Sequence, residues 1–269
     1  MTTPARKRRR SSGKTQEWSI PLLEEWGLTP TQQRLLAVLA SVAGVLVAAV
    51  GLTFAIEAIG NDYTPERATA AAVVTQPRPD TYRAWPSSKV FAPIAESKAD
   101  PKPMTLKDLF SAKTLKEGGV TLRLAGTGLE TDCAAAVWGR ELVDLLAQGG
   151  CTQAARGAYV SADGRYVAQY TLFNLRDTAS ADTLVKELTT LYRGGWVQPL
   201  EAGRAVFPSG GHTESSGHAM GHYAALVWIG RADGAEPGPK DDFVSLSLTV
   251  RGAEKAVFRR VVAASEGSS

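Results

Sequence analysis

The longest apolar stretch of the chain covers residues 35–60 (LLAVLASVAGVLVAAVGLTFAIEAIG), and Glu57 is its only charged residue. A helix needs about 20 consecutive apolar residues to cross the hydrocarbon core of a bilayer. The stretch is too long, and begins too late in the chain, for a cleaved signal peptide. The pattern therefore predicts one transmembrane helix over 35–60 that acts as an uncleaved signal anchor.

Basic residues are concentrated before this stretch. Residues 1–34 hold seven Lys or Arg against three Glu, and all five residues of the run 6–10 are basic. Because cytoplasmic flanks of membrane helices carry an excess of basic residues, the tail 1–34 is expected in the cytoplasm. The prediction is a single-pass protein of the cell membrane with an extracytoplasmic C-terminal domain, and the lipid bilayer is its first expected partner.

Prolines mark the segment that follows. Residues 61–103 hold seven of the fourteen prolines in the chain, which indicates an extended Pro/Ala-rich linker. Some of its residues are too apolar for a fully solvated linker and are expected to dock onto the neighbouring domain. These residues are Tyr82, Trp85, Val90, Phe91 and Ile94.

From residue 104 onward the pattern is that of a folded domain, assigned to 104–264 and followed by a disordered C-terminus, 265–269. Apolar patterns of period two, or continuous apolar runs, predict strands at 118–124, 156–162, 165–173, 223–229 and 243–250. Helical spacing predicts helices at 132–148, 180–192 and 253–263. The order strand–helix–strand–strand–helix–strand matches the split βαβ plan. The predicted fold class is α+β, a small two-layer, ferredoxin-like domain.

The charge balance argues against a nucleic-acid partner. The chain has a net charge of +3, but residues 104–269 hold 17 basic and 18 acidic residues, so the excess belongs to the tail. A nucleic-acid-binding domain is usually marked by a concentration of Lys and Arg. No nucleic acid is therefore expected as a partner.

The two cysteines, Cys133 and Cys151, both fall in the part assigned outside the cytoplasm. Oxidising compartments favour disulfides, so the two are predicted to form one. An unbroken helix over 132–148 would hold the thiols about 20 Å or more apart at 1.5 Å per residue. The disulfide therefore requires the helix to begin later than residue 132.

The three histidines of the chain, His212, His218 and His222, lie together in the segment GGHTESSGHAMGH. Zinc or copper could take His218 and His222, with His212 or Glu214 as a third ligand. Against a metal site, the segment is rich in Gly and Ser, which is typical of a mobile loop, and it lacks the HExxH order of a zinc protease. The expectation is no cofactor, with zinc or copper as the alternative.

Ser215 and Ser216 next to these histidines raise the alternative of a hydrolase. The chain has neither the GxSxG elbow nor the SxxK motif of known serine enzymes. Residues of a catalytic triad are also seldom neighbours in sequence. No motif amounts to an enzyme signature, and the expectation is a protein without catalytic activity.

Two strings, CAAAVWGRELVDLLAQGGC and GHYAALVWIGRADG, on a background rich in Ala, Arg, Gly and Val, resemble membrane-anchored proteins of high-GC actinobacteria. That group has no assigned activity to transfer. The resemblance implies a setting in the cell envelope.

These patterns together predict a membrane-anchored, non-catalytic interaction or ligand-binding module of a bacterial cell envelope. Its expected partner is a membrane or envelope protein, and a homodimer is a further expectation. The alternatives are a metal-binding or sensing domain that uses the three histidines, and an envelope hydrolase with an unrecognised site.

Overall fold

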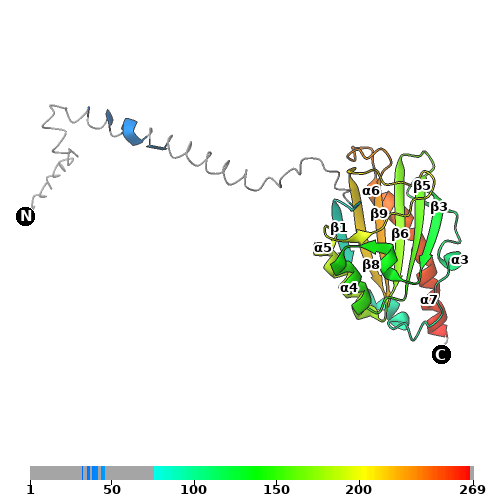
Figure 1. Ribbon diagram of the computed structural model, residues 1–269. Coiled ribbons are helices and arrows are strands. Elements are labelled where there is room, and N and C mark those ends of the chain that lie inside the picture. The colour runs from blue at the N-terminus through cyan, green and yellow to red at the C-terminus, as the bar shows by residue number, and fades with distance from the viewer. Residues whose placement is uncertain (1–31, 33–34, 37, 42–43, 46–75, 267–269) are drawn as a thin grey trace, which may run out of the picture. The chain divides into compact units, whose positions relative to one another are not determined.

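The computed structural model describes residues 32, 35–36, 38–41, 44–45 and 76–266. The chain divides into two compact units, residues 1–71 and residues 72–269. In the first unit the described residues are all helical. The second unit contains the sheet and helices shown in Figure 1.

The prediction of a transmembrane helix over 35–60 is contradicted, because no helix among the described residues is long and apolar enough to cross a membrane. The longest described helix, Thr178–Leu191, has 14 residues. At 1.5 Å per residue it spans about 21 Å, less than the roughly 30 Å of a hydrocarbon core. Within 35–60 the structure describes residues 35–36, 38–41 and 44–45, and the rest of that range lies outside the described residues.

Three further predictions depended on that helix and are corrected with it. They are the single-pass membrane location, the extracytoplasmic placement of the C-terminal domain, and the cell-envelope setting. The predicted tail 1–34 and the C-terminal residues 267–269 also lie outside the described residues, apart from residue 32.

The strands are β1 (Thr81–Trp85), β2 (Thr114–Glu117), β3 (Val120–Glu130), β4 (Val137–Trp138), β5 (Gln153–Ser161), β6 (Tyr166–Asn174), β7 (Trp196–Val197), β8 (Thr213–Met220) and β9 (Tyr223–Arg231). The α-helices are α3 (Leu106–Leu109), α4 (Arg140–Gln148), α5 (Thr178–Leu191), α6 (Phe243–Val250) and α7 (Lys255–Glu266). The short 3₁₀ helices are η1 (Lys89–Ile94), η2 (Cys133–Ala136) and η3 (Arg251–Glu254).

Seven strands form one curled sheet in the order β1-β8-β9-β6-β5-β3-β2, and β4 pairs with β7 in a small separate ribbon (Figure 1). Strand β1 runs parallel to β8, whereas all the other pairs in the large sheet are antiparallel. The two edges of the sheet are therefore β1, from the segment before residue 104, and the four-residue strand β2.

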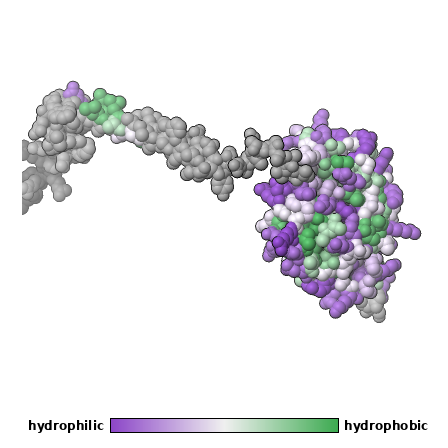
Figure 2. All heavy atoms as spheres, viewed as in Figure 1, coloured by the Kyte–Doolittle hydropathy of each residue, from purple (hydrophilic) through white to green (hydrophobic). Residues whose placement is uncertain are grey.

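Helices cover both faces of this sheet, with α4 in front and α7 behind in Figure 1. On one face α6 and α7 pack with η1 and α3 over the tyrosines of β5 and β6, Tyr159 and Tyr170. On the other face α4 and α5 pack with the β4–β7 ribbon over Phe173 and Trp228. The face of this unit seen in Figure 2 is largely hydrophilic, with smaller hydrophobic patches between.

The predicted two-layer, ferredoxin-like domain is wrong, and the fold is a mixed α/β with a seven-stranded sheet between two helical layers. A split βαβ domain has helices on one face of the sheet only. Strand β9 is buried along residues 223–230, so both of its faces need a cover. That requirement is met by α5 on one face and α6 on the other.

Three segments differ from their predicted structure. The predicted helix over 132–148 is instead η2, β4 and α4 in succession. The range 243–250 is helix α6, because Asp242 caps it by accepting a hydrogen bond from the Ser245 N–H, and Phe243, Leu246 and Val250 share its buried face. The predicted mobile loop around the histidines is strand β8. Its Gly217 leaves room for the Tyr82 ring, whose hydroxyl lies 1.9 Å from where a Cβ would stand.

Three of the five apolar residues singled out in the predicted linker 61–103 pack into the fold, whereas Trp85 and Val90 are exposed. Tyr82 donates a hydrogen bond to the carbonyl of Val185 in α5, and Phe91 and Ile94 are buried under α7. Docking of this segment onto the domain is confirmed, and β1 goes further by joining the sheet.

The predicted disulfide between Cys133 and Cys151 is confirmed, with the two Cα atoms 6.2 Å apart. The helix of this segment begins at Arg140, so η2 and the turn at Gly139 bring Cys133 back beside the end of α4. Gly139 has a φ of 94°, and a Cβ there would lie 2.4 Å from the carbonyl oxygen of Gly194.

Candidate functional site

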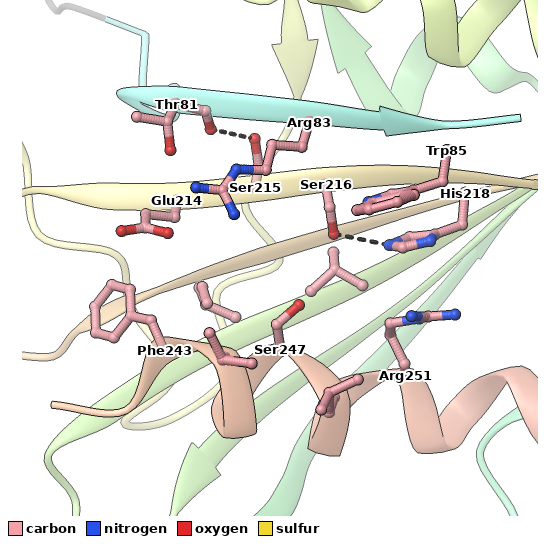
Figure 3. A pocket seen from close by; sticks show the side chains of 14 residues that line it. Thr81, Arg83, Trp85, Glu214, Ser215, Ser216, His218, Phe243, Ser247 and Arg251 are labelled. Atoms are coloured by element: carbon pink, nitrogen blue, oxygen red, sulfur yellow. Dashed lines mark hydrogen bonds between the residues drawn. The ribbon is translucent and has the colours of Figure 1, made fainter.

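A cavity of about 170 Å³ opens between the β1 edge of the sheet and helix α6 (Figure 3). Side chains of period two on β1 and β8 form one wall, because alternate residues of a strand point to the same face. Helix α6 forms the opposite wall, and Val227 and Ile229 of β9 lie at the base. The polar residues of the cavity are Thr81, Arg83, Glu214, Ser215, Ser216, His218, Ser247 and Arg251.

Ser216 and His218 form a hydrogen-bonded pair inside this cavity, with 2.9 Å between Oγ and Nε2. Both side chains lie on the same face of β8, which faces α6 (Figure 3). Trp85 of β1 lies beside His218, with nearly parallel rings whose centroids are 6.3 Å apart. Burial, together with the positive charge of Arg251, lowers the pKa of His218 to about 3, so the imidazole is neutral at pH 7.

A serine next to a histidine is the arrangement of a nucleophile and its base, which bears on the hydrolase alternative. A general base acts best with a pKa near the working pH, and that of His218 is about 3. No carboxylate within the described residues contacts the ring of His218 to orient it, as the third member of a triad would. The pair therefore forms a neutral, polar wall of the cavity, with no step of catalysis assigned to it.

The two arginines of the cavity differ in their surroundings. Arg251 is paired with the buried Glu254 through two hydrogen bonds, of 2.8 and 3.0 Å. Arg83 projects from β1 near Glu214 (Figure 3), yet its guanidinium group has no hydrogen bond or ion pair within the described part of the chain. Arg83 is thus the cation at this site that is free to bind a ligand.

Three large apolar side chains surround the mouth of the cavity. Trp85 is 55% exposed, Val244 is 69% exposed and Leu248 is 47% exposed. Trp85 comes from the sheet edge and the other two from α6, so the cavity lies between apolar groups of two elements. Exposed apolar groups that gather around one opening are typical of a binding surface.

Strand β1 adds a second feature, a free backbone edge. It pairs with β8 on one side only, and no other strand of the described chain pairs with it. Unpaired N–H and C=O groups along a sheet edge are a template for another strand. The cavity and this free edge lie next to each other, because Thr81, Arg83 and Trp85 belong to both.

The three histidines have different surroundings and share no side-chain partner. His212 lies 3.5 Å from Glu214 through Nε2 and 3.1 Å from Glu236 through Nδ1, so its carboxylate neighbours face opposite ring nitrogens. His222 is fully buried beside Asn174 and Asp100. Among the described residues, no group of three or more His, Cys, Asp or Glu could hold a metal ion. Binding of zinc or copper by His212, His218 and His222 stays a prediction.

The sequence had singled out Glu214, Ser215, Ser216 and His218 of this site, and Trp85 as a docking residue, but not Thr81, Arg83, Ser247 or Arg251. Thr81 and Arg83 were missed because the neighbouring prolines, Pro79 and Pro86, made this segment resemble a linker. The string Thr-Tyr-Arg-Ala-Trp between those prolines is rich in strand-forming residues, which was the available signal. Ser247 and Arg251 carry no motif, and only the fold brings them to the cavity.

Comparison with known proteins gives no match to a family model, to a curated protein or to a solved structure.

Proposed function

We propose that the folded unit is a non-catalytic binding module that takes an extended segment of a partner protein along the free edge of β1. The observation that carries the proposal is the position of this edge, directly beside a cavity with an exposed aromatic rim. In β-augmentation, backbone hydrogen bonds supply affinity, while pockets for alternate side chains supply specificity. Strand β1 offers the free backbone groups, and the cavity offers a pocket for a side chain.

The opposite edge of the sheet, β2, is protected against pairing with another strand, whereas β1 is not. Strand β2 has four residues, and Lys113 and Lys116 lie at or next to its exposed positions. Short edge strands with lysines are a common protection against pairing with other chains. Strand β1 has no lysine, and it places a half-exposed tryptophan at its end. The two edges are therefore not equivalent, and β1 is the one suited to a partner.

Pro86 limits the length of the augmented segment. It follows Trp85 directly and has no N–H to donate, so the edge that can pair covers the five residues 81–85. At about 3.3 Å per residue these five residues offer an edge of about 17 Å. Helix α6 lies across the cavity from this edge, and its Val244 and Leu248 can contact the side chains of an added strand.

The test begins with random nine-residue peptides displayed on phage and selected on the immobilised full-length chain. We expect enriched peptides that add amide hydrogen-exchange protection within 81–85 and none in β2, because the new hydrogen bonds form at the β1 edge only. Enriched peptides that leave the exchange of 81–85 unchanged, or an absence of enrichment, would contradict the proposal.

Trp85→Ala should raise the Kd of such a peptide about tenfold or more, since exposed aromatic residues carry much of the energy of binding surfaces. Leu129→Ala is the matched control, because Leu129 is an exposed apolar residue on β3 at a distance in the sheet order from β1. Fluorescence polarisation of a labelled peptide measures both variants, and an equal effect of the two would count against the site.

A further inference from the structure

The charge at the centre of β1 bears on which partner strand can add to it. Arg83 is the middle residue of β1, flanked on the same face by Thr81 and Trp85. On the β8 side its register neighbour is Ser216, which is uncharged. On its other side Arg83 has no register neighbour within the described chain, and an added strand would supply one.

The carboxylate of Glu214 does not neutralise Arg83. Glu214 is the register neighbour of Thr81, one pleat away from Arg83, and no ion pair joins the two. Its carboxylate lies instead 3.5 Å from Nε2 of His212. The other cation of the cavity, Arg251, already has Glu254 as its partner. An incoming strand would therefore meet one guanidinium group without an ion-pair partner, that of Arg83.

Residues directly opposite each other on neighbouring strands interact strongly enough for charge to matter, and like charges there are destabilising. Two copies of the chain that paired antiparallel along all five residues of β1 would place Arg83 opposite Arg83. That arrangement disfavours the homodimer through this edge. A strand with Asp or Glu opposite Arg83 has the complementary charge.

The side chain two positions along from that acid would lie next to Trp85 and the rim of the cavity. Val244 and Leu248 are exposed there and offer apolar contact. The face of the partner strand that looks toward α6 thus combines an acidic residue with an apolar or aromatic one at a spacing of two.

Building on the proposed function, we infer that the partner of β1 is an acidic segment of a different protein, with Asp or Glu opposite Arg83 and an apolar residue two positions away beside Trp85. Arg83 is then the residue that determines specificity for charge. The backbone edge determines where the segment binds, and contact with Trp85 selects the apolar residue of the segment.

The experiment uses the peptides enriched on the full-length chain, as described above, and asks which residues recur in them. We expect one recurrent Asp or Glu, with an apolar or aromatic residue two positions away. For one such peptide, Arg83→Glu should weaken binding at least threefold, because attraction across the strand pair becomes repulsion. Replacing the acidic residue of the peptide with lysine should restore binding to the Arg83→Glu chain and weaken binding to the original chain.

Lys116→Glu is the matched control, because it makes the same charge change at the other edge strand and should leave peptide affinity unchanged. Neither Arg83 nor Lys116 is buried, so both variants are expected to fold. Peptides that protect 81–85 from exchange but show no acidic preference, and that bind Arg83→Glu equally well, would overturn this inference and leave the proposed function standing. Peptides that fail to protect the amides of residues 81–85 from hydrogen exchange would contradict the proposed function itself.

A dimer of the full-length chain would also overturn the inference, if sedimentation shows one and hydrogen exchange locates its contact at 81–85. In that case a second copy, and not an acidic partner, would occupy the edge.

Discussion

His218 shows how burial decides the chemistry of a single side chain. In water a histidine has a pKa near 6.5, but this ring is 5% exposed, hydrogen-bonded to Ser216 and close to Arg251. Burial and the nearby cation lower its pKa to about 3. The histidine that looked like a metal ligand or a base in the sequence is, in the fold, a neutral hydrogen-bonding group.

This lowered pKa predicts a dependence of stability on pH. As the pH falls from about 6.5 to about 3, the unfolded chain binds a proton at His218 that the folded chain excludes, so the free energy of unfolding decreases. Between pH 7 and pH 5 this residue should account for a loss of about 2 kcal/mol. In His218→Gln that part of the loss should disappear, as measured by urea denaturation at the two pH values. An unchanged loss in the variant would show that His218 titrates normally in the fold.

At the scale of elements, the segment from η2 to β5 depends on its disulfide. Cys133 is buried among Ala136, Leu142 and Leu146, whereas Cys151 lies three residues after the end of α4. The disulfide closes a loop with a sequence separation of 18 residues around that nine-residue helix. It therefore holds α4 against the sheet where the short β4–β7 ribbon offers little additional support.

Reduction of this disulfide should lower the free energy of unfolding by about 3 kcal/mol, because a loop of this length gains conformational freedom mainly in the unfolded chain. Guanidinium denaturation with and without a thiol reductant measures the difference. The double variant Cys133→Ala with Cys151→Ala is the control and should be indifferent to the reductant. Equal stability of the oxidised and reduced chain would show that α4 is held by packing alone.

At the scale of the whole unit, one buried polar cluster joins three segments that are distant in the chain. Asp100 precedes α3 and is 9% exposed, and it accepts hydrogen bonds of 2.8 Å from Tyr223 of β9 and from Arg260 of α7. Burial alone would raise the pKa of Asp100, but contacts with His222 and Tyr223 and the charge of Arg260 outweigh it and lower that pKa. The carboxylate is therefore ionised at neutral pH and ties the C-terminal helix to the sheet.

Arg260→Ala should lower the free energy of unfolding by about 3 kcal/mol, because it leaves the buried charge of Asp100 without its cation. Arg260 also donates hydrogen bonds to the carbonyls of Lys102 and Pro103, which the variant loses. Arg259→Ala is the matched control: Arg259 is exposed, donates to the carbonyl of Asp108 and should cost about 0.5 kcal/mol or less. Thermal or urea denaturation compares the two, and equal losses would show that the cluster has no special role.

Local pattern determined several elements of this protein from the sequence alone. The strands near 156–162, 165–173 and 223–229 and the helix near 180–192 lie where their apolar spacing placed them. The disulfide between Cys133 and Cys151 is confirmed, although its prediction rested on an oxidising compartment, a placement that the structure contradicts. The apolar residues within the proline-rich segment correctly indicated docking, because side chains such as Phe91 and Ile94 are poorly solvated wherever the chain places them.

Only the tertiary structure decided the rest, because the same local pattern can serve two structures. The segment 243–250 fits both a strand of alternating residues and a helix with Phe243, Leu246 and Val250 on one face, and the open face of the sheet selected the helix. Half of the residues of β8 are Gly, Ser or His, and the segment becomes a strand because β1 and β9 pair with it on both sides. The candidate site depends on the same long-range pairing: Arg83, Ser216 and Arg251 meet there only because β1 crosses more than 130 positions of the sequence to join β8. Spacing along the chain carries no information about a contact of that range.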